Sequence, residues 1–145
     1  MKIVFDLDNT LVDEFGATVR PGIVRLLDRL LSERHELALW THSDRARAIR
    51  ILRDHGLRDR FGTLVCREDY DPDSLGARKD IRRIQGDLLV DDDPAEVAFA
   101  RSVGRSGFRL ASYRRGDPAD LDELEALHQA IRRASRWWGR LFRGR

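Results

Sequence analysis

The sequence of 145 residues has a single cysteine, Cys66, and only two lysines, Lys2 and Lys79, among its 27 basic residues. With one cysteine no disulfide can form within the chain, which fits a reducing compartment. No apolar run approaches the ~20 residues that span a bilayer. The apolar start, residues 1–5, leads straight into acids without a signal-peptide cleavage site. The sequence therefore predicts a cytoplasmic protein with no transmembrane segment.

Acidic residues are missing from one end of the chain. Residues 131–145 hold six of the 27 basic residues and none of the 25 acids, so residues 1–130, with 21 bases and 25 acids, carry a net charge of −4. We predict a folded core over 1–130 and a basic, Trp/Arg-rich tail over 131–145. Apolar residues, 41% of the chain, recur along most of its length and predict one domain with one core.

Short apolar runs alternate with segments of helical spacing. The runs predict buried strands at 3–5, 37–40, 63–66, 88–90 and 107–110. Strands that alternate with helices form a parallel sheet covered on both faces. We therefore predict an α/β fold, a Rossmann-like three-layer sandwich with a central parallel sheet of five strands.

The helices are predicted from their capping residues and spacing. Four of them are expected at 21–31, 44–55, 94–103 and from 117 onward. Ser43 is the predicted N-cap of the second. A further helix, capped by Asp73 or Ser74, would carry Lys79 and Ile84.

Polar residues follow three of the predicted strands, where ligands of parallel sheets bind. Asp6 and Asp8 stand two residues apart after the first strand, so their side chains can point the same way. Two crowded carboxylates need a cation or a proton, and Mg²⁺ prefers oxygen ligands. The run 91–93 could complete such a shell. The alternative is that these acids only cap strands and start turns.

Four motifs together resemble the haloacid dehalogenase (HAD) superfamily. The run Asp6-Leu7-Asp8-Asn9-Thr10 is similar to its first motif, Asp-x-Asp-x-Thr after an apolar strand. Thr41 matches the second motif, Lys79 the basic third motif, and Asp91-Asp92 the acidic fourth motif. The motifs stand in the family's order over roughly residues 2–110, and the set is specific.

Two stretches narrow the resemblance. Residues 79–83 and 90–94 are similar to the branch that holds the small C-terminal-domain protein phosphatases and their NIF-like bacterial relatives. Asn9 stands where that branch usually has Glu, and Asp93 where it often has Ser.

The resemblance implies an HAD-type phosphatase, a phosphoric monoester hydrolase that forms an aspartyl-phosphate on Asp6. Asp8 would protonate the leaving oxygen and then deprotonate the attacking water. Thr41 and Lys79 would bind phosphoryl oxygens, and the compact ammonium stands out in a chain that otherwise uses arginine. His42 would either touch the substrate or have a structural role.

The resemblance also implies Mg²⁺ as the cofactor. The ion would bind the Asp6 carboxylate, the backbone carbonyl of Asp8, and Asp92, with Asp91 in a supporting role. Asp93 is more suited to capping the helix that starts at 94.

The segments between the motifs leave room for a short flap at 14–20 but for no cap domain. An open site admits a phosphorylated protein side chain, which is the leading hypothesis for the substrate. The alternatives are a nucleic-acid 3′-phosphatase, a small-metabolite phosphatase whose lid comes from a neighbouring subunit, a phosphotransferase, and a binding module with a vestigial site.

The tail interleaves Trp137, Trp138, Leu141 and Phe142 with arginines, while Gly139 weakens a helix that continues to the end. It could pack on the core as a terminal helix. It could instead dock to an acidic partner, a membrane surface or a second subunit. Nucleic-acid binding by arginine and stacked tryptophan is the third alternative.

Overall fold

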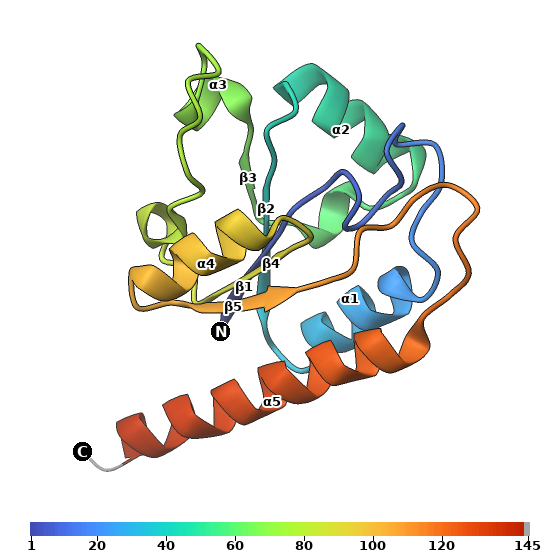
Figure 1. Cartoon of the computed structure of the whole chain (residues 1–145). Coiled ribbons are helices and arrows are strands. Elements are labelled where there is room, and N and C mark those ends of the chain that lie inside the picture. The colour runs from blue at the N-terminus through green and yellow to red at the C-terminus, as the bar shows by residue number, and fades with distance from the viewer. Residues whose placement is uncertain (144–145) are drawn as a thin grey trace.

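The computed structural model describes the backbone of residues 1–143 and the side chains of residues 1–140. Five parallel strands form a central sheet in the order β3-β2-β1-β4-β5 (Figure 1). They are β1 (Lys2–Phe5), β2 (Glu36–Trp40), β3 (Thr63–Val65), β4 (Leu88–Asp91) and β5 (Ser106–Arg109). The predicted strands and the α/β three-layer fold are confirmed.

Successive residues of the central strand β1 face two separate apolar layers. On one face, Ile3 and Phe5 pack in a cluster with residues of α1 (Ile23–Ser32), α2 (Arg45–Asp54) and α5 (Leu121–Arg143). On the other face, Val4 packs with residues of the 3₁₀ helix η2 (Ile81–Ile84) and α4 (Pro94–Ser102). The residues of β1 from Ile3 to Phe5 point to opposite faces and are all apolar and buried, because helices cover both faces of the sheet there.

No cap domain is inserted within the described residues. A short flap and α1 connect β1 to β2, and α2, η1 (Arg58–Arg60), β3, α3 (Arg67–Tyr70) and η2 connect β2 to β4. The prediction of a core without a cap is thus confirmed for residues 1–143, and no inserted domain covers the carboxyl ends of β1, β2 and β4.

The flap begins with a tight turn after β1. The carbonyl of Leu7 accepts hydrogen bonds from the three backbone N–H groups of residues 10–12. Val12 then pairs with Val19 in an antiparallel bridge that closes the flap. Gly16 near its tip has a φ of 70°, a left-handed conformation that favours glycine.

Asp13 at the base of the flap is expected to stabilise the fold in a pH-dependent way. Burial would raise its pKa, but hydrogen bonds from Thr18, Ala17 and Phe15 outweigh burial and lower the pKa to about 2. Because this lies below the ordinary value of 3.8, the stabilisation is complete above that value and is lost as the pH falls toward 2. We expect Asp13→Asn to lower the free energy of unfolding by about 2 kcal/mol at neutral pH.

Urea denaturation of the wild type and Asp13→Asn from neutral pH down to about pH 2.5 would measure this difference. The difference should shrink in the acid range, while Asp54→Asn, at an exposed site, should have little effect at any pH. A difference that stayed constant with pH would contradict a role for the Asp13 charge.

The prediction between β3 and β4 is wrong. The predicted helix, capped by Asp73 or Ser74, would carry Lys79 and Ile84. Residues 71–80 are instead a loop that includes Lys79, and only Ile84 lies in a helix, the short η2. Ser74 has a φ of 52°, outside the helical region, and the Asp71 carboxylate accepts two backbone N–H groups of the loop. These local hydrogen bonds compete with a helix.

The helix α5 is continuous from Leu121 to Arg143, across the boundary expected at 130/131 and through Gly139. Ile131 is fully buried in the core, so the first residue of the expected tail is part of the packing. Trp137 is exposed. None of the described helices has the length and apolarity to cross a membrane. The predictions for the tail also involve side chains outside the described residues: Leu141, Phe142, Arg143 and Arg145.

Candidate active site

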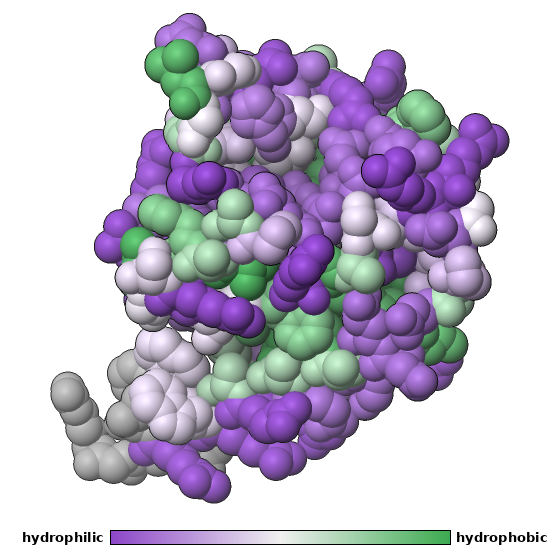
Figure 2. All heavy atoms as spheres, in the orientation of Figure 1, coloured by the Kyte–Doolittle hydropathy of each residue, from purple (hydrophilic) through white to green (hydrophobic). Residues whose placement is uncertain are grey.

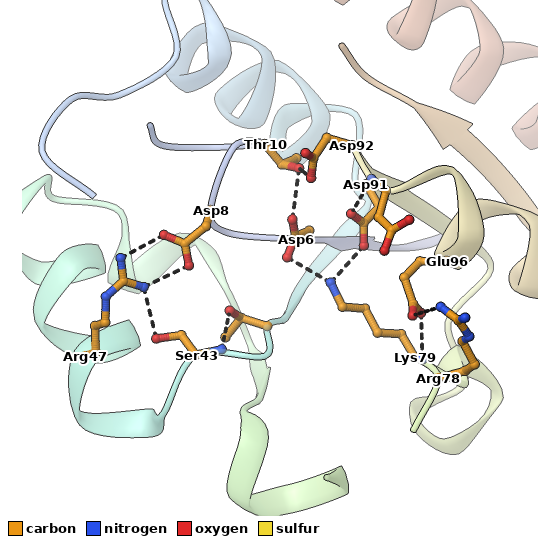
Figure 3. Close-up of polar contacts among 12 residues, drawn as sticks. Asp6, Asp8, Thr10, Ser43, Arg47, Arg78, Lys79, Asp91, Asp92 and Glu96 are labelled. Atoms are coloured by element: carbon orange, nitrogen blue, oxygen red, sulfur yellow. Dashed lines mark hydrogen bonds and ion pairs between the residues drawn. The ribbon is translucent and has the colours of Figure 1, made fainter. Parts of the chain in front are cut away.

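Three adjacent strands bring polar residues to one edge of the sheet. Asp6 directly follows β1, Thr41 follows β2, and Asp91 is the last residue of β4. Because these strands are parallel neighbours, their carboxyl ends lie side by side, where ligands bind in such sheets. Figure 3 shows Asp6, Asp91, Asp92 and Lys79 together at this edge.

Lys79 reaches this edge from the loop before η2. Its Nζ lies 2.8 Å from Asp6 Oδ1 and 2.8 Å from Asp91 Oδ2, and the residue is only 6% exposed. Burial alone would lower the pKa of Lys79, but Asp6 and Asp91 outweigh burial and raise it. The ammonium is therefore charged and joins the two predicted acidic motifs.

Asp6, Asp91 and Asp92 form a cluster of carboxylates in which one oxygen of each lies within 4.8 Å of the others. Burial, together with repulsion by Asp91 and Asp92, raises the pKa of Asp6 despite the attraction of Lys79. Three carboxylates against one ammonium leave an excess of negative charge that a divalent cation would neutralise. The cluster therefore fits Mg²⁺ in charge and in ligand type.

The two neighbouring acids differ in how their oxygens are used. Asp91 is fully engaged, since Oδ2 accepts from Lys79 and Oδ1 accepts from the backbone N–H of Asp93 at 3.0 Å. Asp92 is partly exposed, and its Oδ1 lies 3.3 Å from the Thr10 hydroxyl. Asp93 caps α4 as predicted, since its side chain accepts from the backbone N–H of Ala95.

Thr10 is a site residue that the sequence reasoning did not single out. Its hydroxyl is buried and lies 3.1 Å from Asp6 Oδ2, in addition to its contact with Asp92. The sequence could have indicated this role, because Thr10 is the last residue of the first motif. The next residue back, Asn9, has a φ of 61° and donates its side-chain amide to the backbone carbonyl of Tyr113.

Asp8 does not join the carboxylate cluster. Its carboxylate points away from Asp6 and forms an ion pair with Arg47 of α2, in which both oxygens are engaged (Figure 3). Sequence reasoning missed Arg47. The chain has many arginines, and the sequence does not indicate which of them pairs with Asp8. The predicted acid/base residue is thus held by a side chain from another element.

Thr41 and His42 lie where β2 ends. Thr41 is buried and its Oγ1 accepts the backbone N–H of Ser43 at 3.0 Å, which shapes the turn into α2. The half-exposed His42 lies 3.2 Å from the Asp71 carboxylate through Nε2. His42 faces the cleft beside Asp6, whereas the Thr41 hydroxyl contacts its own turn.

The loop that carries Lys79 is fixed by Glu96 of α4. This buried carboxylate accepts the backbone N–H of Lys79 at 2.8 Å and a hydrogen bond from Arg78 at 2.9 Å (Figure 3). An irregular loop can place a buried ammonium reproducibly only when its backbone is held in this way. Glu96 had no sequence signal beyond an acidic residue in the first turn of a helix.

A cleft of 420 Å³ leads from this cluster between the loop 71–80 and the start of α4. Figure 2 shows a largely hydrophilic surface over the upper part of the molecule, in the same orientation as Figure 1. The cleft is lined mainly by polar side chains, including His42, Tyr70, Ser74, Arg78 and Glu96. Polar lining suits a charged ligand better than an apolar one.

Comparison with known proteins identifies the class. The sequence model of the NLI interacting factor-like phosphatase family matches residues 1–136. A Thermotoga maritima protein assigned as a β-phosphoglucomutase has a similar structure, with a TM-score of 0.65 and 15% identity over 88% of this chain and 98% of that one. A HAD-superfamily hydrolase of subfamily IA from Geobacter sulfurreducens has a TM-score of 0.61 and 14% identity, over 88% and 98%.

A hydrolase from Streptococcus pneumoniae is also similar, with a TM-score of 0.62 and 13% identity over 77% of this chain and 92% of that one. No curated protein matches the chain. The fold and the family model define a phosphatase of the HAD fold, with no cap domain inserted in the part of the chain that the structure describes. Within that class, the chain belongs to the NLI interacting factor-like phosphatase family.

Proposed function

We propose that this phosphatase hydrolyses phosphomonoesters through an aspartyl-phosphate on Asp6, with Mg²⁺ as its cofactor. The observation that carries the proposal is the buried contact of Asp6 with Lys79, 2.8 Å apart, beside the acids Asp91 and Asp92. A carboxylate and a phosphate monoester repel each other, so that attack requires positive charge between them.

The reaction takes two steps. In the first, a carboxylate oxygen of Asp6 forms a bond to phosphorus as the bond to the leaving oxygen breaks, and Asp8 gives its proton to that oxygen. In the second, Asp8 takes a proton from a water molecule whose oxygen bonds to phosphorus. This releases inorganic phosphate and restores the Asp6 carboxylate. Thr41 and Lys79 hold phosphoryl oxygens.

The residues suited to hold Mg²⁺ are Asp6, Asp92 and the backbone carbonyl of Asp8. Of the two neighbouring acids, Asp91 is better suited to a supporting role, because it is buried and holds Lys79 and the backbone N–H of Asp93, whereas Asp92 is partly exposed. When bound, Mg²⁺ supplies neutralising charge between the nucleophile and the phosphoryl group.

The substrate we propose is a phosphorylated protein side chain. The polar cleft beside Asp6 has no cap domain over it in the described residues, which favours a phosphate that protrudes from a large molecule. A small metabolite would gain less binding surface and less exclusion of water there. The alternative substrate is a nucleic acid with a 3′-phosphate. Its backbone could bind Arg132, Arg133 and Arg136, which are exposed on α5.

Purified protein is expected to hydrolyse phosphopeptides with a higher kcat/KM than nucleotides, sugar phosphates or 3′-phosphorylated oligonucleotides. Activity should disappear in a chelator and return with Mg²⁺, since the carboxylate cluster needs a cation to approach phosphate. Phosphate release across this panel measures both expectations.

The panel includes a control variant in which Arg132, Arg133 and Arg136 are replaced by glutamine. This variant should keep its activity on phosphopeptides. Preferred hydrolysis of the oligonucleotide, lost in the variant, would replace the phosphoprotein with a nucleic acid. No turnover of any substrate with any divalent metal would indicate a vestigial site and overturn the proposal.

A further inference from the structure

Arg47 holds Asp8 in one orientation by a two-point contact. Its Nη1 donates to Asp8 Oδ2 at 2.8 Å, and its Nη2 donates to Asp8 Oδ1 at 2.9 Å. The planar guanidinium therefore fixes both the direction and the plane of the carboxylate, which a single ammonium would not do. The two side chains are 29% and 30% exposed, so the pair is partly shielded from water.

Arg47 is itself held from several sides. Its backbone N–H donates to the side chain of Asp44, which caps α2 in place of the predicted Ser43. Ser43 Oγ instead accepts from Arg47 Nη1 at 3.1 Å. The flap also lies next to the guanidinium, since a Cβ on Gly16 would be 3.6 Å from Arg47 Nη2. These contacts make Arg47 a fixed support.

We propose that Arg47 is the positioning residue of Asp8 and sets the orientation of its carboxyl group for both proton transfers. The inference rests on the proposed function, in which Asp8 is the acid and base. Each carboxyl oxygen has a lone pair besides the one that faces Arg47, so Asp8 can give its proton to the leaving oxygen while the two-point contact is kept. The same lone pair then accepts the proton of the water that cleaves the acyl-phosphate, so that each cycle ends with the proton back on Asp8.

The test compares leaving groups. An alkyl phosphate needs a proton on its leaving oxygen, whereas an activated aryl phosphate with an acidic phenol does not, and kcat/KM reports the step in which that bond breaks. We expect Arg47→Met to lower kcat/KM for the alkyl phosphate by about 10- to 100-fold and for the aryl phosphate by less than about 3-fold. Arg47→Lys keeps the charge but not the two-point contact and should resemble Arg47→Met.

Two further variants separate positioning from other roles. In an Asp8→Asn background, Arg47→Met should cause no additional loss, because its effect passes through Asp8. Arg50→Met changes an exposed arginine one turn along α2 and should leave both substrates unaffected. Equal losses for both leaving groups, full rescue by Arg47→Lys, or additive losses with Asp8→Asn would each overturn the inference.

A failure of the inference is distinguishable from a failure of the proposed function. If Asp8→Asn shows the leaving-group dependence and Arg47→Met does not, only the role of Arg47 is wrong. If Asp8→Asn shows no such dependence, Asp8 is not the acid, and the proposed mechanism fails with it.

Discussion

Replacement of Asp6 by asparagine is expected to lower kcat by at least about 10⁴-fold, because an amide cannot attack phosphorus to form the acyl-phosphate. The fold should survive this change. Removal of one of three clustered carboxylates leaves Lys79 paired with Asp91 and lowers the repulsion at the site. The variant should therefore unfold at the same temperature as the metal-free wild type, or at a higher one.

Two measurements separate the loss of chemistry from a loss of folding. Rapid quenching with a ³²P-labelled substrate should trap a protein-bound phosphate that hydroxylamine releases in the wild type and that is missing in Asp6→Asn. Asp122→Asn makes the same change at the exposed start of α5 and should behave like the wild type in both activity and labelling. Labelled protein from Asp6→Asn would assign the nucleophile to another residue.

Replacement of Lys79 by methionine is expected to reduce both activity and stability. The ammonium is buried between Asp6 and Asp91, so its loss leaves buried carboxylates without their partner. Breaking a buried ion pair in this way costs about 3–5 kcal/mol of unfolding free energy. Loss of the charge that stabilises the transferring phosphoryl group should lower kcat by about 10²- to 10³-fold.

The stability of Lys79→Met should depend on metal. Urea denaturation in a chelator should show the full loss, and Mg²⁺ should restore part of it, because the ion supplies positive charge to the same carboxylates. The matched control is Lys2→Met, at the other lysine of the chain, whose ammonium is partly exposed beside Glu36. A similar loss in both variants, or no effect of Mg²⁺, would contradict the role assigned to Lys79.

The sequence predicted the parts of the site that depend on local pattern. Asp6, Thr41 and Asp91 each follow or end an apolar run, and a parallel sheet brings such strand ends to one edge. That geometry requires no knowledge of which side chains touch. The family resemblance then added Lys79, although the helix predicted to carry it is a loop.

The missed features depend on contacts between distant parts of the chain. Asp8 and Arg47 are 39 residues apart, Lys79 and Glu96 are 17 apart, and His42 and Asp71 are 29 apart. Each pairing depends on how the helices, strands and loops pack together, which the local sequence pattern does not determine. The helix α3 was missed for another reason, since its four residues are too short to show a helical period.

The central position of β1 in the sheet bears on whether partly unfolded forms of the protein can be active. The backbone N–H of Asp6 still donates to the carbonyl of Val90, and β1 is paired on both sides, so we expect its amide protons to exchange only when the whole molecule unfolds. Lys79, by contrast, lies on a loop fixed by the side chain of Glu96. A partial opening of this loop would separate the Lys79 ammonium from Asp6 while Asp6 is still held next to the sheet. If the two residues act as we propose, such partly unfolded forms are expected to be inactive.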